Sequence, residues 1–152
     1  LHKFVEIDAN RPAPEELPLA HKYKDLHDAG RDDEIPYTAM ALTIAVSEAI
    51  RMCNLEFGPD TFTLELTGLK IGPVAFLGIP GEPFTGVGRG LKEAKGWDLV
   101  LPCCLTNGSE GYFPMQDSYD EGGYEAVGSV FGPKTAELLV ENGLKVLNLL
   151  AE

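Results

Sequence analysis

Gly78-Ile79-Pro80-Gly81-Glu82-Pro83-Phe84 is the stretch of this sequence that decides its fold. The apolar residues 74–77 lead directly into it, and the helix-forming residues 91–95 follow soon after it. Because Gly and Pro end strands and open turns, this order predicts a buried strand, a loop and a helix. Open α/β sheets place their chemistry at such strand ends, which makes Glu82 a candidate functional residue. A glutamate in a loop is otherwise most often a solvated side chain.

Two further strands are predicted around this stretch. Residues 61–67 alternate polar and apolar side chains, the pattern of a half-buried strand, and Gly72-Pro73 then turns the chain into residues 74–79. Residues 99–101 form another short apolar run. We therefore expect a hairpin that feeds a central, more deeply buried strand.

Two long helices are predicted from apolar residues that recur at steps of three and four. One begins at Thr38, keeps Thr43, Ser47, Arg51 and other polar residues on its second face, and ends before Phe57. The other follows Gly132-Pro133. We expect an α/β fold, with a mixed β-sheet and packed helices in α/β/α layers, and we expect this chain to hold only part of that domain.

Residues 1–36 differ from the rest of the chain in being charged and in carrying four prolines. Within them, residues 15–29 could hold a polar helix closed by Gly30. We interpret residues 1–36 as an arm or linker and residues 37–152 as the globular segment. The three histidines lie at positions 2, 21 and 27 without HxH or HExxH spacing, so we expect them on the surface.

Length, composition and charge narrow the class of partner. The chain has 152 residues, 44% of them hydrophobic, which is enough for one domain with its own core. Twenty-four acidic residues against twelve basic ones give a net charge of −12, and that charge would repel a phosphate backbone. A nucleic-acid partner is therefore not expected.

Cysteine usage and hydropathy bear on the compartment. Cys53, Cys103 and Cys104 are an odd number without a CxxC spacing, so a disulfide framework is not expected and a reducing, cytoplasmic compartment is favoured. No apolar run approaches ~20 residues, and no signal-peptide pattern is present. Because the first residue is Leu1, the chain is expected to be a piece of a longer protein.

Two motifs that could indicate a functional site lack features that such a site requires. The glycines of residues 85–90 match neither GxGxxG nor GxxxxGK[ST], so a nucleotide site is not expected there. Cys103 and Cys104 follow a strand and could act as nucleophiles, but no histidine follows His27 to activate them. A thiol-dependent enzyme with a histidine from another chain remains an alternative hypothesis, whereas Cys53 lies on an apolar helix face and is expected to be packed.

Four blocks in fixed order carry a resemblance to a known family. They are Gly78-Ile79-Pro80-Gly81-Glu82-Pro83-Phe84, Leu105-Thr106-Asn107-Gly108-Ser109-Glu110-Gly111-Tyr112, Gly122-Gly123-Tyr124-Glu125-Ala126 and Phe131-Gly132-Pro133-Lys134-Thr135. Together they resemble the C-terminal part of the catalytic domain of the neutral/alkaline ceramidase family. The resemblance covers roughly residues 60–150, and the order of the blocks makes it more specific than any one block.

The resemblance implies a zinc-dependent amidase on a layered α/β domain. In that family the glutamate that matches Glu82 and the tyrosine that matches Tyr124 are zinc ligands. Two upstream histidines complete the site, and a serine contributes to it. Zinc lowers the pKa of a bound water so that hydroxide can attack an amide carbonyl. Tyr112 precedes the same region and could orient the substrate or the oxyanion.

The departures from the family limit what this chain can do alone. The upstream histidines and the serine have no counterpart here, and two protein ligands rarely hold a catalytic zinc. We therefore expect an inactive segment that needs the upstream part of the same polypeptide to cleave an N-acyl amide, whether a small molecule or a lipid. The alternative is a non-catalytic binding or interaction module in which Glu82 and Tyr124 are ordinary loop residues. A partial domain should also expose apolar surface and form homo-oligomers.

Overall fold

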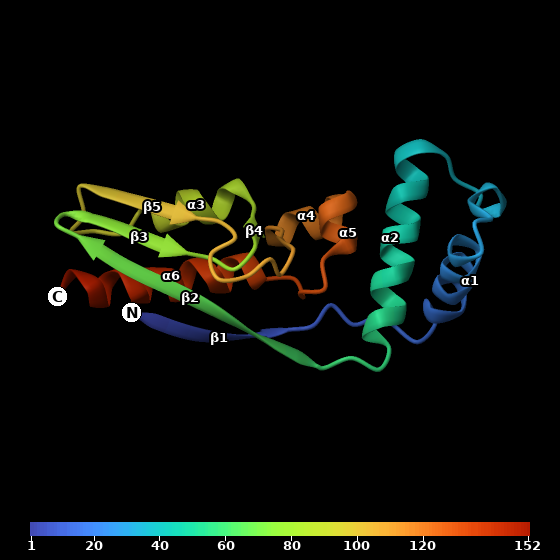
Figure 1. The fold of residues 1–152 in the computed structure, drawn as a ribbon, viewed down its shortest axis with the longest axis horizontal. Coiled ribbons are helices and arrows are strands. Elements are labelled where there is room, and N and C mark those ends of the chain that lie inside the picture. The colour runs from blue at the N-terminus through green and yellow to red at the C-terminus, as the bar shows by residue number, and fades with distance from the viewer.

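The computed structural model describes residues 1–152 as a mixed sheet with helices on one side and a pair of helices at one end (Figure 1). The elements in chain order are β1 (His2–Asp8), α1 (Leu17–Asp28), the 3-10 turn η1 (Asp32–Glu34), α2 (Ala39–Leu55), β2 (Thr61–Ile71), β3 (Val74–Gly78), β4 (Glu82–Pro83), α3 (Thr85–Leu91), β5 (Leu99–Cys103), β6 (Tyr112–Phe113), α4 (Gln116–Glu121), α5 (Tyr124–Gly128) and α6 (Thr135–Ala151). None of the helices combines the length and the apolar character that crossing a bilayer requires.

The main sheet has four strands in the order β1-β2-β3-β5. β1 and β3 each pair with β2 in antiparallel fashion, and β5 pairs with β3 in parallel. The predicted hairpin between β2 and β3 is present, and Gly72 takes a φ of 57° at its turn, a conformation that favours glycine. The mixed α/β class predicted from the sequence is confirmed.

One face of this sheet is covered by α6, which in turn packs against α3. Gly68 of β2 lies under α6, where an added Cβ would stand 2.5 Å from a Val146 methyl carbon. Gly143 of α6 allows the same close approach to Leu77 and Leu91. The resulting core comprises sixteen buried residues, drawn mainly from the strands, α3 and α6. It holds β3 in place, and therefore the loop that follows it.

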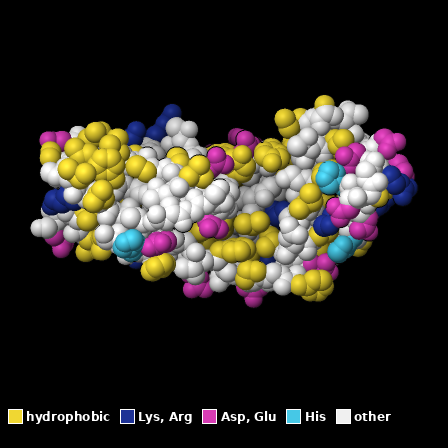
Figure 2. Space-filling model, viewed as in Figure 1, with side chains coloured by type: hydrophobic (Ala, Val, Ile, Leu, Met, Phe, Trp, Pro, Cys, Tyr) yellow, Lys and Arg dark blue, Asp and Glu magenta, His cyan; other side chains and the backbone are white.

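The opposite face of the sheet carries no helix within residues 1–152, so the second helical layer of the predicted α/β/α arrangement is not among these residues. The strand registers place Phe4, Leu69, Ile71 and Leu99 on this face. All four side chains are exposed, Phe4 to 66% and Ile71 to 58%. Figure 2 shows hydrophobic side chains gathered over β3 and β5 on the side turned away from α6.

Residues 1–36 contain more structure than an arm or linker. β1 is an edge strand of the main sheet, and its Val5 and Ile7 are buried between exposed neighbours. The predicted polar helix is present as α1, which lies beside α2; the two helices and Ile35, which follows η1, form a separate cluster of six buried residues. Figure 1 shows this helical pair at one end of the molecule, with α4 and α5 between it and the sheet.

Candidate functional site

The loop after β3 is positioned by backbone hydrogen bonds to two other segments. The amide of Ile79 donates to the carbonyl of Cys103 at 2.8 Å, and the amide of Glu82 donates to the carbonyl of Gly111 at 2.8 Å. Gly81 permits this second approach, because a Cβ there would stand 2.5 Å from the Gly111 oxygen. The Gly-Pro turn predicted from the sequence therefore brings two loops together, and Glu82 lies where they meet.

Glu82 and Tyr112 are neighbours because of a second, two-stranded sheet. β4 and β6 run parallel, with Glu82 paired to Tyr112. Tyr124, the first residue of α5, then lies beside Tyr112, with the ring centroids 6.2 Å apart at an interplanar angle of 73°. Gly123 precedes it with a φ of 109°, which only glycine adopts readily. The structure thus brings together the three residues singled out from the sequence.

The electrostatics of this cluster are negative. The charge of Glu82 raises the pKa of the Tyr112 hydroxyl above its ordinary value, and partial burial, Tyr124 and Glu125 raise it further. Tyr112 therefore stays protonated at neutral pH and can donate a hydrogen bond. Glu82 forms no ion pair, since none of the salt bridges of the chain includes it.

An open hollow of about 470 Å³ lies beside this cluster. Its lining includes Glu82, Tyr112 and Glu125, with Asp117 at the start of α4. The lining holds three carboxylates and the Tyr112 phenol but no cationic side chain, and carboxylate oxygens are common ligands of divalent cations such as zinc. Of the two zinc ligands expected from the sequence, Glu82 lines this hollow, whereas Tyr124 lines a second hollow and reaches this cluster only through its ring contact with Tyr112.

The histidines and cysteines do not join this cluster. No three His, Cys, Asp or Glu side chains of the chain stand together in an arrangement that could hold a metal ion. His2, His21 and His27 are exposed, as predicted, and each pairs with a carboxylate, those of Glu65, Glu56 and Asp32 respectively. The Cys103 thiol donates to the carbonyl of Leu101, and no histidine hydrogen-bonds to it.

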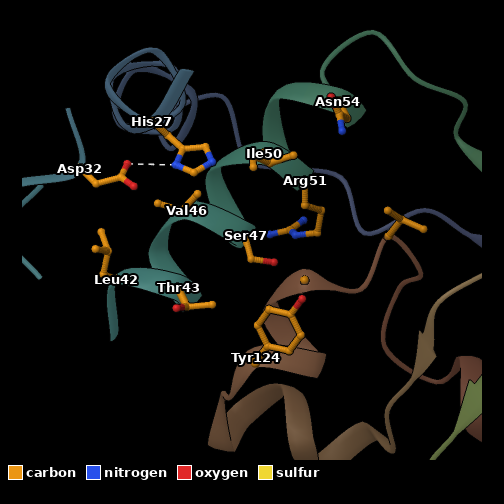
Figure 3. A pocket seen from close by; sticks show the side chains of 12 residues that line it. His27, Asp32, Leu42, Thr43, Val46, Ser47, Ile50, Arg51, Asn54 and Tyr124 are labelled. Atoms are coloured by element: carbon orange, nitrogen blue, oxygen red, sulfur yellow. Dashed lines mark hydrogen bonds and ion pairs between the residues drawn. The ribbon is translucent and has the colours of Figure 1, made fainter. Parts of the chain in front are cut away.

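A second hollow, missed in the sequence analysis, lies on the other side of Tyr124 between α2 and α5 (Figure 3). Its polar wall comes from Thr43, Ser47, Arg51 and Asn54 of α2, spaced by three or four residues. That spacing was visible in the sequence, but a polar helix face is usually solvated. Here the face is turned toward α5.

Comparisons with known proteins bear on the fold. No family model matches the chain, and no curated protein matches it. Among solved structures, the neutral ceramidase from Pseudomonas aeruginosa matches with a TM-score of 0.51 and 22% identity over 61% of this chain and 16% of that one. A ceramidase complexed with C2 matches with a TM-score of 0.51 and 22% identity, over 60% of this chain and 15% of that one.

The two matches show a ceramidase-like fold for the 60–61% of this chain that they cover. The chain spans only 16% and 15% of the lengths of these two ceramidases. At 22% identity the similarity concerns the fold alone. Any chemistry has to be argued from the residues of the site.

Proposed function

We propose that this chain is the C-terminal segment of the catalytic domain of a ceramidase-like, zinc-dependent hydrolase that cleaves an N-acyl amide bond. The observation that carries the proposal is that Glu82 pairs with Tyr112 beside one open hollow, while the Tyr124 ring packs against the Tyr112 ring. These residues come from three separate elements, β4, β6 and α5, and the chain resembles solved ceramidases in fold.

Each residue has a distinct role in the proposed reaction. The Glu82 carboxylate and the Tyr124 phenol supply two of the metal ligands, and histidines from an upstream part of the same polypeptide supply the others. Zinc, when bound, lowers the pKa of a water so that hydroxide forms at neutral pH. The Tyr112 phenol, which like phenols in general is protonated at neutral pH, donates a hydrogen bond to the oxygen that becomes negative when the amide carbonyl is attacked.

The proposal is tested first by zinc content. Zinc per chain is measured by elemental analysis on the protein as its gene encodes it, on its Glu82→Ala variant and on residues 1–152 alone. We expect about one zinc in the first, loss in the variant and little or none in the short chain. Glu110→Gln is a matched control, because Glu110 lies in the adjacent loop but outside the lining of the hollow. Full zinc occupancy in Glu82→Ala would contradict the assignment.

A second candidate function is a binding or interaction module that keeps the fold without the metal chemistry. The exposed apolar face with Phe4, Leu69, Ile71 and Leu99 favours it, because monomeric proteins rarely leave such a patch uncovered. It would also account for the expected self-association. Light scattering after size exclusion measures the mass of the chain; a clean monomer together with bound zinc would count against this alternative.

A further inference from the structure

The hollow between α2 and α5 has about the volume of a small organic molecule, near 440 Å³. Figure 3 shows Arg51 and Ser47 of α2 on one side and Tyr124 of α5 on the other, with Leu42, Val46 and Ile50 also in the lining. A mixed apolar and polar lining with a few convergent donors is typical of small-molecule sites.

Arg51 is the most unusual group in this hollow. Its side chain is only 7% exposed, and charged residues are almost never buried unless they are paired. Its Nε–H donates to the carbonyl of Val127 at 2.7 Å, and Nη1 donates to the carbonyl of Asn10. Nη2 makes no hydrogen bond within the chain, and the nearest carboxylate oxygen, on Glu48, is 4.0 Å away. The guanidinium therefore retains a donor group that has no hydrogen bond within the chain and is not fully enclosed.

Hydroxyl groups and free space accompany this donor. Ser47 and Thr43 lie on the same face of α2, one and two turns before Arg51, and both line the hollow. Gly128 of α5 also lines it, and a Cβ there would stand 2.8 Å from the Ser47 hydroxyl. The absence of a side chain at Gly128 therefore keeps the space next to Ser47 open.

The charges around Arg51 select the type of anion. Glu48 and Glu16 partly offset the guanidinium, and His27 is held by Asp32 at 2.9 Å. One partly offset positive charge can balance a single negative charge but not two. In a chain of net charge −12, a dianion would be repelled further.

We propose that this hollow binds the carboxylate of a small ligand through Arg51 Nη2 and the Ser47 hydroxyl. Tyr124 lines this hollow and its ring packs against that of Tyr112, which lines the hollow beside Glu82, so a single aromatic pair separates the carboxylate site from the proposed metal cluster. Resting on the function proposed above, this makes the substrate an N-acyl amino acid, whose amide lies within a few bonds of a free carboxylate. The carboxylate site itself does not depend on zinc.

The test uses two probes that differ only in charge. N-acetylglycine and its neutral amide, N-acetylglycinamide, are titrated by NMR into the encoded protein after treatment with a chelator, so that neither can bind through a metal. A charged hydrogen bond to a buried arginine should favour the acid about tenfold. Equal affinity for the two probes overturns the proposal, and so does inorganic phosphate that binds as tightly as the acid.

Variants separate ligand binding from the structural role of Arg51. Gly128→Ala leaves both carbonyl hydrogen bonds of Arg51 intact but fills the space beside Ser47, so it should weaken binding of the acid about tenfold with little change in Tm. Glu48→Gln removes the offsetting charge and should tighten binding of the acid severalfold, which a purely structural arginine would not produce. Unchanged binding in both variants overturns the proposal.

Hydrolysis by the zinc-loaded protein then distinguishes the two proposals. Selective binding of the acid without hydrolysis of an N-acyl glycine would refute the proposed function and leave the carboxylate site standing. Hydrolysis of a neutral N-acyl amide, without preference for the acid, would support the hydrolase and overturn the carboxylate site.

Discussion

The sheet and the helical pair are held together in different ways. The sheet, α3 and α6 share sixteen buried residues, several of them with no exposed surface, such as Leu66, Leu77 and Leu147. The helical pair has six, which retain between 2% and 9% of their surface. Its link to the rest runs in part through the polar hydrogen bonds of Arg51 to Val127 and Asn10. Stability is therefore concentrated in the sheet, while the hollow beside Arg51 lies where α2 of the helical pair meets α5.

Among the variants that compare the two regions, Leu147→Ala should lower the free energy of unfolding the most. Leu147 is fully buried in α6, so truncation removes apolar contacts and leaves a cavity in the larger core. The free energy of unfolding should fall by about 2–5 kcal/mol. Trp97, the single tryptophan, packs against this core, and its fluorescence during urea unfolding measures the change. An unchanged transition would show that α6 does not stabilise the sheet.

Gly143→Ala should destabilise the same region less. The new Cβ would stand 2.4 Å from a Leu91 methyl carbon and 2.7 Å from a Leu77 methyl carbon. The added methyl group would therefore overpack the interface of α6 with α3 and β3. We expect a loss of about 1–3 kcal/mol in the Trp97 transition. Gly88→Ala in α3 is the control, because the nearest atom to its Cβ is 4.0 Å away. That change should be neutral or stabilise by up to about 1 kcal/mol.

Met52→Ala tests whether the helical pair can open alone. Met52 is buried in the cluster between α1 and α2, away from the sheet core. Hydrogen exchange of the α1 and α2 amides should accelerate at least about tenfold through local opening, while the Trp97 transition shifts by less than about 1 kcal/mol. Equal destabilisation of both regions would mean that the molecule unfolds as one unit.

Two surface ion pairs, one in each region, should give the smallest effects. A hydrogen bond from Arg31 lowers the pKa of Glu34 beside the helical pair, and one from Lys145 lowers the pKa of Glu141 in α6. Since the folded state favours the ionised forms, each contribution is present above the ordinary glutamate pKa of about 4.3 and is lost as pH falls through the lowered value.

Glu141→Gln should therefore reduce the acid dependence of the Trp97 transition slightly, whereas Glu34→Gln should alter only hydrogen exchange in the helical pair. Unfolding and exchange at about pH 6 and about pH 3.5, on either side of that ordinary pKa, measure both effects. A larger acid effect for Glu34→Gln on the Trp97 transition would contradict the separation of the two regions.

Sequence reasoning succeeded where the pattern is local. The alternation of residues 61–67 and the helical spacing before and after it correctly predicted β2, α2 and α6. β1 was missed because Phe4 next to Val5 interrupts the short alternation in a charged segment, and pairing with β2 is what makes Val5 and Ile7 core residues. β4 and β6, two residues each, are too short to show any period.

The candidate site was predictable in part for the same reason. Glu82 follows from a strand that ends in Gly and Pro, and Tyr112 and Tyr124 were singled out with it. That the three lie together depends on the pairing of β4 with β6 and on the glycine turn before α5, which are contacts between distant segments. The hollow beside Arg51 was missed because nothing local shows that the polar face of α2 meets another helix.

The position of α6 in the chain has a consequence for biosynthesis. α6 covers the apolar face of β2 and β3, yet it leaves the ribosome after every strand of the sheet. Translation at about 5–20 residues per second leaves those strands uncovered for several seconds while the chain is completed. The nascent protein therefore exposes the apolar face of β2 and β3 until α6 has been synthesised, and a chaperone that covers this face would act in that interval.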